Sequence, residues 1–376
     1  MTKVIHVVES LDRGAIEGWL VRMLRHARAR GVELDWTFYC SIEGIGPMDD
    51  EARALGARVV HSPVPLGRKT DFIRALRDEL YHGRYDVLHC HHDLVSAVYL
   101  TAAFGLPIVK ALVHVHNADE TVPTPNRFKQ SILRPLLRRA CLTAADGVVG
   151  NSNHTLDTFL AGRRRRGGRD VVHYYGIDPV PFERARRDRR GFRAGLGVAD
   201  RARILLFAGR MVPEKNPMFA LDVLAELHRL DPTVVGLFVG AGSLEDAIRQ
   251  RAAALGIERA VRHLGWRGDV PEIMCCCDWF ILPHPEQPME GFGIAVVEAQ
   301  LAGLRLLLST GVSDDPLLPT ACFRRHRLSA GARSWAESAL GLLDGDEPAA
   351  AAAFAALRRS PMDMDRALDD LMRLHA

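Results

Sequence analysis

The chain lacks several features that would place it in a specialised class of protein. No apolar run approaches the roughly 18–20 residues that span a bilayer, and no signal-peptide pattern precedes the strand-like segment Lys3–Val8. Its 49 basic and 46 acidic residues nearly cancel, to a formal net charge of +3, so bulk electrostatic binding to nucleic acid is not expected. The seven cysteines are odd in number and include no C-x-x-C pair, which argues against a disulfide framework. We therefore expect a cytoplasmic protein with reduced, mostly buried thiols.

Short apolar runs alternate with longer amphipathic stretches in the first half of the 376-residue chain. Apolar residues recur at helical spacing from Ile16 to Arg30, and Gly31 suits the end of that helix. The segments that read as strands are Lys3–Val8, Asp35–Tyr39, Arg58–His61, Asp86–Cys90, Ile108–His114, Gly147–Gly150 and Asp170–Tyr174. This alternation predicts an α/β fold, with a parallel sheet covered by helices on both faces.

The same alternation of apolar runs and amphipathic stretches resumes after the segment Asp178–Asp200. This segment is rich in proline, arginine and glycine, and we interpret it as a linker and hinge. Asn216 stands as a cap before Pro217, and Ser243 with Asp246 matches a capping box. The strands predicted in this half are Ile204–Ala208, Val234–Val239, Trp279–Leu282 and Arg305–Ser309. The sequence thus predicts two doubly wound, Rossmann-like domains, residues 1–178 and 179–361, with a ligand cleft facing the carboxyl ends of both sheets.

Three biased segments have ordinary structural explanations. The arginine-rich stretches within 163–169 and 184–190 lack the interleaved aromatics that stack on bases, so we interpret them as solvated surface. The segment Arg127–Arg139 mixes apolar and basic residues; packing against the first sheet is favoured over peripheral membrane contact, which also fits the pattern. The run Ala349–Ala353 predicts an exposed helix.

The segment from Pro283 to Ala299 carries the most information about function. A strand ends in a proline-rich loop, and Gly291 and Gly293 then allow close approach of the backbone to a ligand where a helix begins, an arrangement that suits a phosphate. Glu290 and Glu298 are separated by eight positions, which corresponds to roughly 12 Å along a helix. That reach matches the two ends of a nucleotide sugar better than the paired carboxylates of a hydrolase, which lie about 5–9.5 Å apart.

A second group of candidate residues lies between Phe207 and Asn216. Gly209 ends a predicted strand, Arg210 offers a planar fork to phosphate oxygens, and Lys215 supplies a mobile point charge at the start of the next helix. Together these cations would neutralise a leaving diphosphate. Ordinary surface charges are the alternative interpretation of the same spacing.

In combination these motifs resemble the family-four retaining glycosyltransferases, which use nucleotide sugars and have the GT-B fold. The resemblance rests on Gly209-Arg210 with Glu214-Lys215-Asn216, on Gly265-Trp-Arg-Gly-Asp-Val270, and above all on Glu290-Gly-Phe-Gly293 followed by Glu298. It extends to Asn151-Ser152 and Gly176-Ile-Asp178, and His114-Val-His-Asn117 more loosely suggests bacterial polysaccharide or secondary-metabolite transferases. The family also implies that a final helix, residues 362–376, crosses back to the first domain.

The resemblance implies roles for individual residues. Arg210 and Lys215 would hold the donor diphosphate, Glu290 the donor sugar, Glu298 the ribose hydroxyls, and Arg267 would lie near the base. Gly14 takes the place of the first glycine in a Gly-Gly-x-Glu loop near the phosphates; Ala15 replaces the second, and Tyr175 stands where the family commonly has asparagine. The donor-binding residues implied are Gly14, Gly209, Arg210, Lys215, Arg267, Glu290, Gly291, Phe292, Gly293 and Glu298.

Histidines gather at the ends of two predicted strands: His89, His91, His92, His114 and His116. A metal site is not favoured there, because only Asp93 and Asp119 offer nearby carboxylates and the resemblance implies no metal. Four of the five are expected to be satisfied by hydrogen bonds or to face solvent. His116 matches a family position that hydrogen-bonds the transferred sugar, and Asn117 and Asp119 are candidates for the acceptor pocket.

The resemblance implies a metal-independent enzyme without a cofactor that transfers a hexose-type sugar from a nucleoside diphosphate to a hydroxyl of a glycan, lipid-linked or natural-product acceptor, with retention. Glu290, His116, Arg210 and Lys215 are the implied catalytic residues. A nucleotide-sugar epimerase of the same fold and a non-catalytic sugar-binding module remain alternatives. Nucleic acid is not an expected partner, and peripheral contact with the inner face of the membrane remains open.

Overall fold

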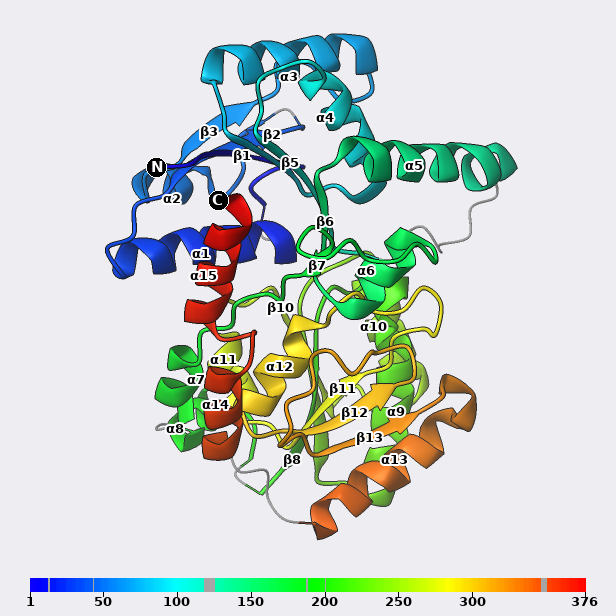
Figure 1. Cartoon of the computed structure of the whole chain (residues 1–376). Helices are drawn as coiled ribbons and strands as arrows, with labels where there is room; N and C mark the ends of the chain where they lie inside the picture. The colour runs from blue at the N-terminus through cyan, green and yellow to red at the C-terminus, as the bar shows by residue number, and fades with distance from the viewer. Residues whose placement is uncertain (13, 43, 118–125, 187–188, 200, 346–349) are drawn as a thin grey trace. The chain divides into compact units, whose positions relative to one another are not determined.

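The chain folds into two compact units, each built around its own parallel sheet (Figure 1). The computed structural model describes residues 1–12, 14–42, 44–117, 126–186, 189–199, 201–345 and 350–376. Unit 1 comprises Met1–Gly176 and Pro361–Ala376, and unit 2 comprises Ile177–Ser360. The chain therefore passes into unit 2 after Gly176, and its last helix belongs to unit 1. No helix in the described part of the chain combines the length and apolarity that crossing a membrane requires.

The sheet of unit 1 has seven parallel strands in the order β3-β2-β1-β4-β5-β6-β7. Strand order reverses at β1, where β2 lies on one side and β4 on the other. The strands are β1 (Lys3–Val8), β2 (Asp35–Cys40), β3 (Arg58–His61), β4 (Val87–Cys90), β5 (Lys110–Val115), β6 (Gly147–Gly150) and β7 (Val171–Val172).

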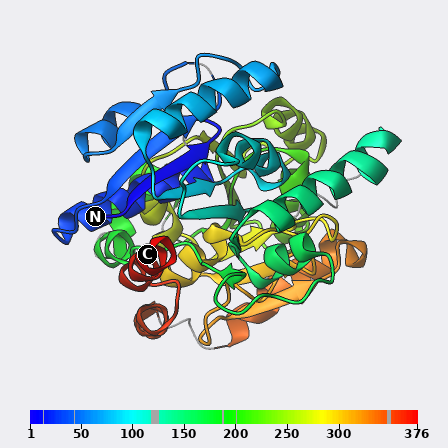
Figure 2. The same cartoon turned by 45° about the horizontal axis from the view of Figure 1, so that its top comes forward.

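Helices cover both faces of this sheet. Helices α3 and α4 lie along one face, and α1 and α15 lie on the other (Figures 1 and 2). Met364, Leu368 and Leu371 of α15 are buried, as their helical spacing predicts. The helices of unit 1 are α1 (Ala15–Ala29), α2 (Asp49–Ala54), α3 (Lys69–Gly83), α4 (Ser96–Ala103), α5 (Arg134–Ala144), α6 (Asn153–Leu160) and α15 (Met364–His375), with the short turns η1 (Asp93–Val95) and η3 (Lys129–Leu133).

Unit 2 has a six-stranded parallel sheet in the order β10-β9-β8-β11-β12-β13. Its core includes the fully buried Trp279 and Trp335. The strands are β8 (Arg203–Ala208), β9 (Val234–Val239), β10 (Val261–Gly265), β11 (Trp279–Leu282), β12 (Arg305–Ser309) and β13 (Phe323–His326). The helices are α7 (Val180–Ala185), α8 (Arg189–Gly195), α9 (Pro217–Leu230), α10 (Glu245–Ala254), α11 (Val270–Cys275), α12 (Ile294–Leu301), α13 (Gly331–Gly341) and α14 (Ala350–Arg359), with the turns η5 (Pro213–Lys215), η6 (Leu328–Ala330) and η7 (Leu342–Asp344).

The structure corrects the predicted linker. Residues in 178–200 form α7 and α8, both part of unit 2, and both contact α11. Phe182 is buried, and the largely buried guanidinium of Arg193 donates a hydrogen bond to the carbonyl of Cys276. These two short helices contain few apolar residues, so the sequence shows only weak apolar periodicity in this segment.

Three further local predictions are wrong in detail. Helix α10 begins at Glu245, whose carboxylate accepts from the N–H of Gly242, so Ser243 and Asp246 do not form the capping box. Ala350 and Ala353 of α14 are buried rather than exposed, whereas Ala349 lies outside the described residues. Helix α12 begins only at Ile294, so a single helix does not join Glu290 to Glu298.

The thiols and one arginine-rich stretch agree with expectation. None of the seven cysteines, all of which lie in the described part of the chain, forms a disulfide, and six of them are buried. In the stretch 163–169, Arg165 pairs with Asp157 and Arg166 with Asp170, each at 2.8 Å. These arginines are thus neutralised by local acidic partners on the surface of unit 1. Arg187 of the second stretch is outside the described residues.

Candidate functional site

The loops that follow the strands of unit 2 are joined to one another at the carboxyl edge of the sheet. The N–H of Gly240, after β9, donates to the carbonyl of Gly265 at 2.8 Å, and the N–H of Glu290, after β11, donates to the carbonyl of Gly311 at 2.8 Å. Gly240 has a φ of +126°, and a Cβ there would lie 2.0 Å from the carbonyl oxygen of Gly209. Only glycine fits this position, so the loop after β9 stays close to the loop after β8.

Lys215 and Glu290 meet at the point where strand order reverses. Lys215 ends the loop after β8, and its Nζ donates to Glu290 Oε2 in the loop after β11, the neighbouring strand. The side chain of Glu290 is 10% exposed and that of Lys215 is 20% exposed. Asn216, with a φ of 53°, holds the two loops together because its amide donates to the carbonyl of Pro283 at 3.0 Å. Such a switch point is where open α/β sheets bind ligands.

The electrostatics of this pair favour an ionised Glu290. Burial raises the pKa of its carboxyl group, but Lys215, followed by His284 and Arg210, more than offsets burial, so the pKa falls below the ordinary 4.5. His284 Nε2 lies 3.7 Å from Glu290 Oε2. Burial lowers the pKa of His284, so this imidazole is neutral at pH 7. The site therefore presents one buried carboxylate, two cations and a neutral imidazole.

Two glycines and an aromatic residue carry the chain from Glu290 into α12. Gly293 caps the helix with a φ of +77°, a conformation that favours glycine, and Phe292 is buried. Helix α12 begins at Ile294, four residues after Glu290, and its first N–H groups form a polar helix start. Glu298 is half-buried in the second turn of α12.

Arg210 and Arg267, the other two basic residues predicted to bind the donor, differ in how available their side chains are to a ligand. Arg210 is exposed directly after Gly209. Arg267 makes a two-pronged contact with Asp269, in which Nε lies 2.7 Å from Oδ1 and Nη2 contacts Oδ2. This contact is the main reason that the pKa of Asp269 is lowered. Arg267 would have to share its donors to reach a nucleotide base.

The predicted phosphate loop of unit 1 is the amino end of α1. Gly14 is its N-cap, and a Cβ there would lie 2.3 Å from Oε2 of Glu17. Ala15 is the first residue of the helix and has ordinary helical geometry. Glu17 was not predicted from the sequence: its burial, together with the nearby charges of Glu9 and Asp12, raises the pKa of its carboxyl to about 7. The Gly14-Ala-Ile-Glu17 match to Gly-Gly-x-Glu is the signal that points to it.

His116 lies in the interior of unit 1 with both ring nitrogens engaged. Its Nε2 is 3.1 Å from His91 Nδ1, and its Nδ1 is 2.7 Å from the hydroxyl of Tyr175. Its side chain is 3% exposed, and burial lowers its pKa to about 3. To hydrogen-bond a sugar, His116 would have to give up one of these two contacts.

The candidates for the acceptor pocket follow β5. Asn117 is exposed, and its amide donates to Asp93 Oδ2 at 3.2 Å. Asp93 also accepts from the backbone N–H of His116 at 2.8 Å, so it fixes the end of the strand. Asp119 lies outside the described residues.

The expectation that four of the strand-end histidines are satisfied or solvated holds for His91 and His92, whose ring nitrogens have partners, and fails for His89 and His114. His89 and His114 are fully buried, and among the described residues His89 Nε2 and both nitrogens of His114 have no hydrogen-bond partner. A buried polar group without a partner costs about 1–3 kcal/mol. Sequence reasoning also missed three members of this buried layer: His6, His173 and His375.

The structure thus divides the predicted residues between the two units. Gly209, Arg210, Lys215, Glu290 and the start of α12 gather at the carboxyl edge of unit 2. Gly14, His116 and Asn117 belong to unit 1. His284, which directly follows Pro283 at the end of a buried strand, is a further polar group of the unit-2 site that sequence reasoning did not single out.

Comparison with known proteins agrees with this geometry. A family model described as "Glycosyltransferase Family 4" matches residues 16–181, and one described as "Glycosyl transferases group 1" matches residues 188–313. A D-inositol 3-phosphate glycosyltransferase of Mycolicibacterium gilvum is 31% identical over 313 residues, covering 78% of this chain and 69% of that protein. One from Nocardia farcinica is 29% identical over 373 residues, covering 89% of this chain and 78% of the relative.

A solved structure with the same fold is that of HepE from Anabaena in complex with UDP-glucose. It superposes with a TM-score of 0.78 at 20% identity and covers 99% of each chain. The two family models together match both halves of the chain, and the two parallel sheets and the switch-point site of unit 2 agree with them. The chain therefore belongs to the family-four glycosyltransferases and has their GT-B fold.

Proposed function

We propose that this glycosyltransferase moves a hexose-type sugar from a nucleoside diphosphate to a hydroxyl acceptor with retention of anomeric configuration, and that the transfer needs no metal. Unit 2 binds the donor and unit 1 the acceptor. The observation that carries the proposal is the buried Lys215–Glu290 pair at the switch point of the unit-2 sheet. Its cation suits a diphosphate, and its carboxylate suits sugar hydroxyls.

The proposed chemistry follows from where charge develops during transfer. As the sugar leaves, the anomeric carbon becomes positive and the departing diphosphate becomes negative. Lys215 and Arg210 stabilise that negative charge, and each well-placed donor contributes roughly 3–4 kcal/mol to the transition state. The N–H groups of Phe292 and Gly293, together with the carboxylate of Glu290, hold the sugar, and Glu298 accepts from the ribose hydroxyls.

Retention follows if the acceptor attacks on the face that the diphosphate leaves. The acceptor hydroxyl gives its proton to a departing phosphate oxygen, so no enzymatic nucleophile is required. His116 and Asn117 are the unit-1 residues proposed to contact the transferred sugar and the acceptor. The names of the curated relatives suggest an inositol phosphate as the first acceptor to test.

A panel of nucleotide sugars tests the proposed function. We expect one UDP-, GDP- or ADP-hexose to raise the melting temperature and to be hydrolysed slowly without acceptor, because binding to the folded state alone stabilises it. With inositol phosphate or a glycan acceptor and EDTA present, NMR should show a product with the anomeric configuration of the donor. Conversion of the donor to its epimer without acceptor would favour the epimerase, and no affinity for any nucleotide would overturn the donor site.

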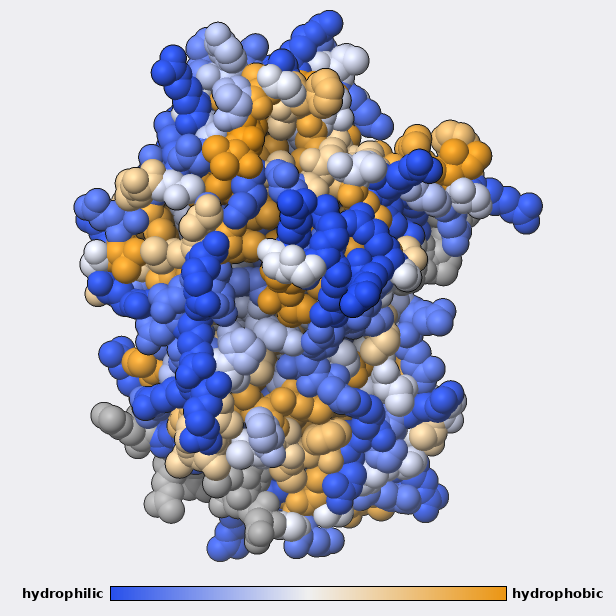
Figure 3. Space-filling view, in the orientation of Figure 1, coloured by the Kyte–Doolittle hydropathy of each residue, from blue (hydrophilic) through white to orange (hydrophobic). Residues whose placement is uncertain are grey.

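A stripe of exposed apolar side chains that runs from Phe128, the residue before η3, into α5 favours contact with a membrane. Phe128, Ile132 and Leu136 recur every fourth residue and are 55–61% exposed. Figure 3 shows hydrophobic and hydrophilic side chains side by side over this segment. No acidic residue occurs between Asn126 and Ala145, whereas the segment carries Arg127, Lys129, Arg134, Arg138 and Arg139.

Packing on the sheet, which the sequence favoured, holds for only part of the segment. Cys141 belongs to the core of unit 1, and Leu137 and Leu142 pack against that core. The stripe of Phe128, Ile132 and Leu136 remains on the surface, and apolar side chains beside clustered cations suit an anionic lipid surface. We propose that this stripe binds the enzyme to the inner face of the membrane.

Vesicle binding tests the membrane proposal. The chain should sediment with phosphatidylglycerol vesicles far more than with phosphatidylcholine vesicles, and Phe128→Ser, Ile132→Ser and Leu136→Ser together should reduce binding at least about tenfold, since each removes apolar area from the lipid boundary. Phe104→Ser, at a side chain 84% exposed outside the stripe, is the matched control and should bind normally. Equal binding of the triple variant and the wild type would exclude the stripe.

A further inference from the structure

One face of the unit-1 sheet carries histidine where the opposite face carries aliphatic side chains. Alternate residues of a strand point to opposite faces, and Ile5 of β1 and Leu88 of β4 belong to the apolar core on one face. His6 and His89 are register partners on these neighbouring strands, and His91 follows His89 by two residues. The three histidines therefore share a face, where each is at most 3% exposed.

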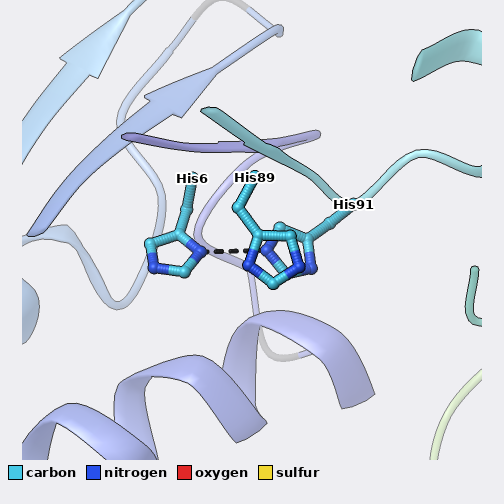
Figure 4. A group of neighbouring side chains, drawn as sticks. All are labelled: His6, His89 and His91. Atoms are coloured by element: carbon cyan, nitrogen blue, oxygen red, sulfur yellow. Dashed lines mark hydrogen bonds between the residues drawn. The ribbon is translucent and has the colours of Figure 1, made fainter. Parts of the chain in front are cut away.

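The ring nitrogens of these three histidines converge. His6 Nδ1 lies 2.9 Å from His91 Nε2 (Figure 4), and one nitrogen from each of His6, His89 and His91 lies within 4.8 Å of the other two. A tetrahedral metal with bonds of about 2.0–2.1 Å separates its nitrogen ligands by about 3.4 Å. Small side-chain adjustments would therefore bring all three nitrogens to one ion.

Hydrogen bonding leaves part of this cluster without partners. His89 Nε2 is fully buried and has no hydrogen-bond partner in the described part of the chain. Unpartnered buried nitrogens in native proteins call for an explanation, and an ion is one.

We propose that His6, His89 and His91 bind one Zn²⁺ ion inside unit 1. Three imidazoles without a carboxylate suit zinc and not calcium or magnesium, which take oxygen ligands. The sequence argued against a metal because Asp93 and Asp119 are the only nearby carboxylates in the sequence and the family resemblance implies no metal. His6, contributed by β1, supplies the missing ligand.

The ion would act on the fold of unit 1 and not on the sugar transfer. It would join β1 to β4 beneath α15, whose His375 Nε2 lies 3.0 Å from His89 Nδ1. Since a metal that binds the folded state alone stabilises it, the bound ion should raise the stability of the unit that contains the chain's last helix.

Metal content and stability test the site on the untagged full-length chain. After treatment with EDTA, Zn²⁺ is added to the native chain and, separately, during refolding from urea, because the site is buried. We expect about one zinc per chain by mass spectrometry in at least one of these preparations, a higher melting temperature, and the visible absorption of tetrahedral Co²⁺ when cobalt replaces zinc. Wild-type protein that takes up neither metal by either route overturns the proposal, whatever the variants do.

Matched variants locate the site within the histidine layer. His6→Gln and His89→Gln should weaken zinc binding at least about tenfold, whereas His173→Gln, a buried histidine outside the proposed set, should bind as the wild type does. His114→Gln tests the neighbouring set of His91, His114 and His116. Loss of zinc in His114→Gln with normal binding in His6→Gln would assign the metal to that set and overturn the present one.

Discussion

Replacing Lys215 or Glu290 by alanine is expected to lower kcat for sugar transfer by at least about a hundredfold, equivalent to about 2.7 kcal/mol. Lys215→Ala removes a cation proposed to stabilise the leaving diphosphate. It also leaves Glu290, 10% exposed, buried without its main counter-charge. Glu290→Ala removes the proposed contact to the donor sugar and frees Lys215 from its partner.

Loss of stability must be separated from loss of chemistry. Removing one member of a buried ion pair destabilises the fold because the other charge stays uncompensated. The double variant Lys215→Met with Glu290→Gln keeps the side-chain volumes and leaves no buried charge. It should melt close to the wild type and yet remain as inactive as the single variants.

The measurement is kcat with the donor that the nucleotide-sugar panel selects, together with the melting temperature of each variant. Arg249→Ala breaks an exposed pair of unit 2, in which Arg249 lies 2.8 Å from Asp246, and is the matched control; both quantities should stay near wild-type values. Near-normal turnover in Lys215→Ala and Glu290→Ala would remove both residues from the active site.

Local sequence patterns predict most strands, including β1 and β4, in which a histidine interrupts the apolar run, and fail for two strands that carry charged residues. β9 and β11 are uninterrupted or nearly uninterrupted apolar runs, and their bounds were predicted from the sequence. β10 and β13 were missed because Arg262 and His263 interrupt one, and Arg324, Arg325 and His326 occupy most of the other. Both are edge strands of their sheet, which are less buried and so tolerate polar residues.

The loops of the donor site were predicted from spacing, but the contact between them was not. Arg210, Lys215 and Glu290 each follow a predicted strand, and the carboxyl ends of parallel strands meet at one edge. That Lys215 contacts Glu290, 75 residues away, depends on β8 being adjacent to β11, and strand order is not encoded in local spacing. Resemblance to a family supplied the roles of these residues, and the fold supplied their pairing.

The histidine layer shows a period that was available in the sequence but overlooked. Histidine alternates with apolar residues in Leu88-His-Cys-His91 and in Val113-His-Val-His116, the period of two that places histidines on one face of each strand. This signal predicts two rows of histidine on the sheet. His375 could not be found in this way, because it reaches the layer from α15 through tertiary packing.

Mild acid is expected to unfold unit 1 at a pH at which unit 2 stays folded. Seven buried histidines of unit 1 have pKa values lowered chiefly by burial: His6, His89, His91, His114, His116, His173 and His375. In the unfolded chain these groups return to about 6.5. Below that pH the unfolded state binds protons that the folded state excludes, so the free energy of unfolding falls as the pH falls.

The pH range over which unit 1 is destabilised, and the loss of free energy of unfolding, follow from these histidine pKa values. Destabilisation begins near pH 6.5 and continues down to about 3, where burial places the pKa of His116 and His375. At pH 5.5 a histidine whose folded-state pKa is about 3, as for His116 and His375, costs about 1.4 kcal/mol, so these two cost about 3 kcal/mol together, and the other five add to the loss in the same direction. Unit 1 should therefore lose stability steadily below about pH 6.5 and unfold between about pH 6 and 4.

Hydrogen exchange with EDTA present, corrected for the intrinsic pH dependence of exchange, should show loss of protection in peptides from β1, β4 and β5 as the pH falls through this range. Peptides from β8 and β9 of unit 2 serve as the internal control, because His284 is the buried histidine described in that unit.

His114→Gln should reduce the slope of the free energy of unfolding against pH by about 1.4 kcal/mol per pH unit, since it removes one proton from the difference between the unfolded and folded states. Its two ring nitrogens have no hydrogen-bond partner among the described residues, so the substitution breaks none of the hydrogen bonds identified there. Protection in β1 and β4 that persists to pH 4 would show that the histidine layer takes up protons without unfolding, and the burial argument would then be wrong.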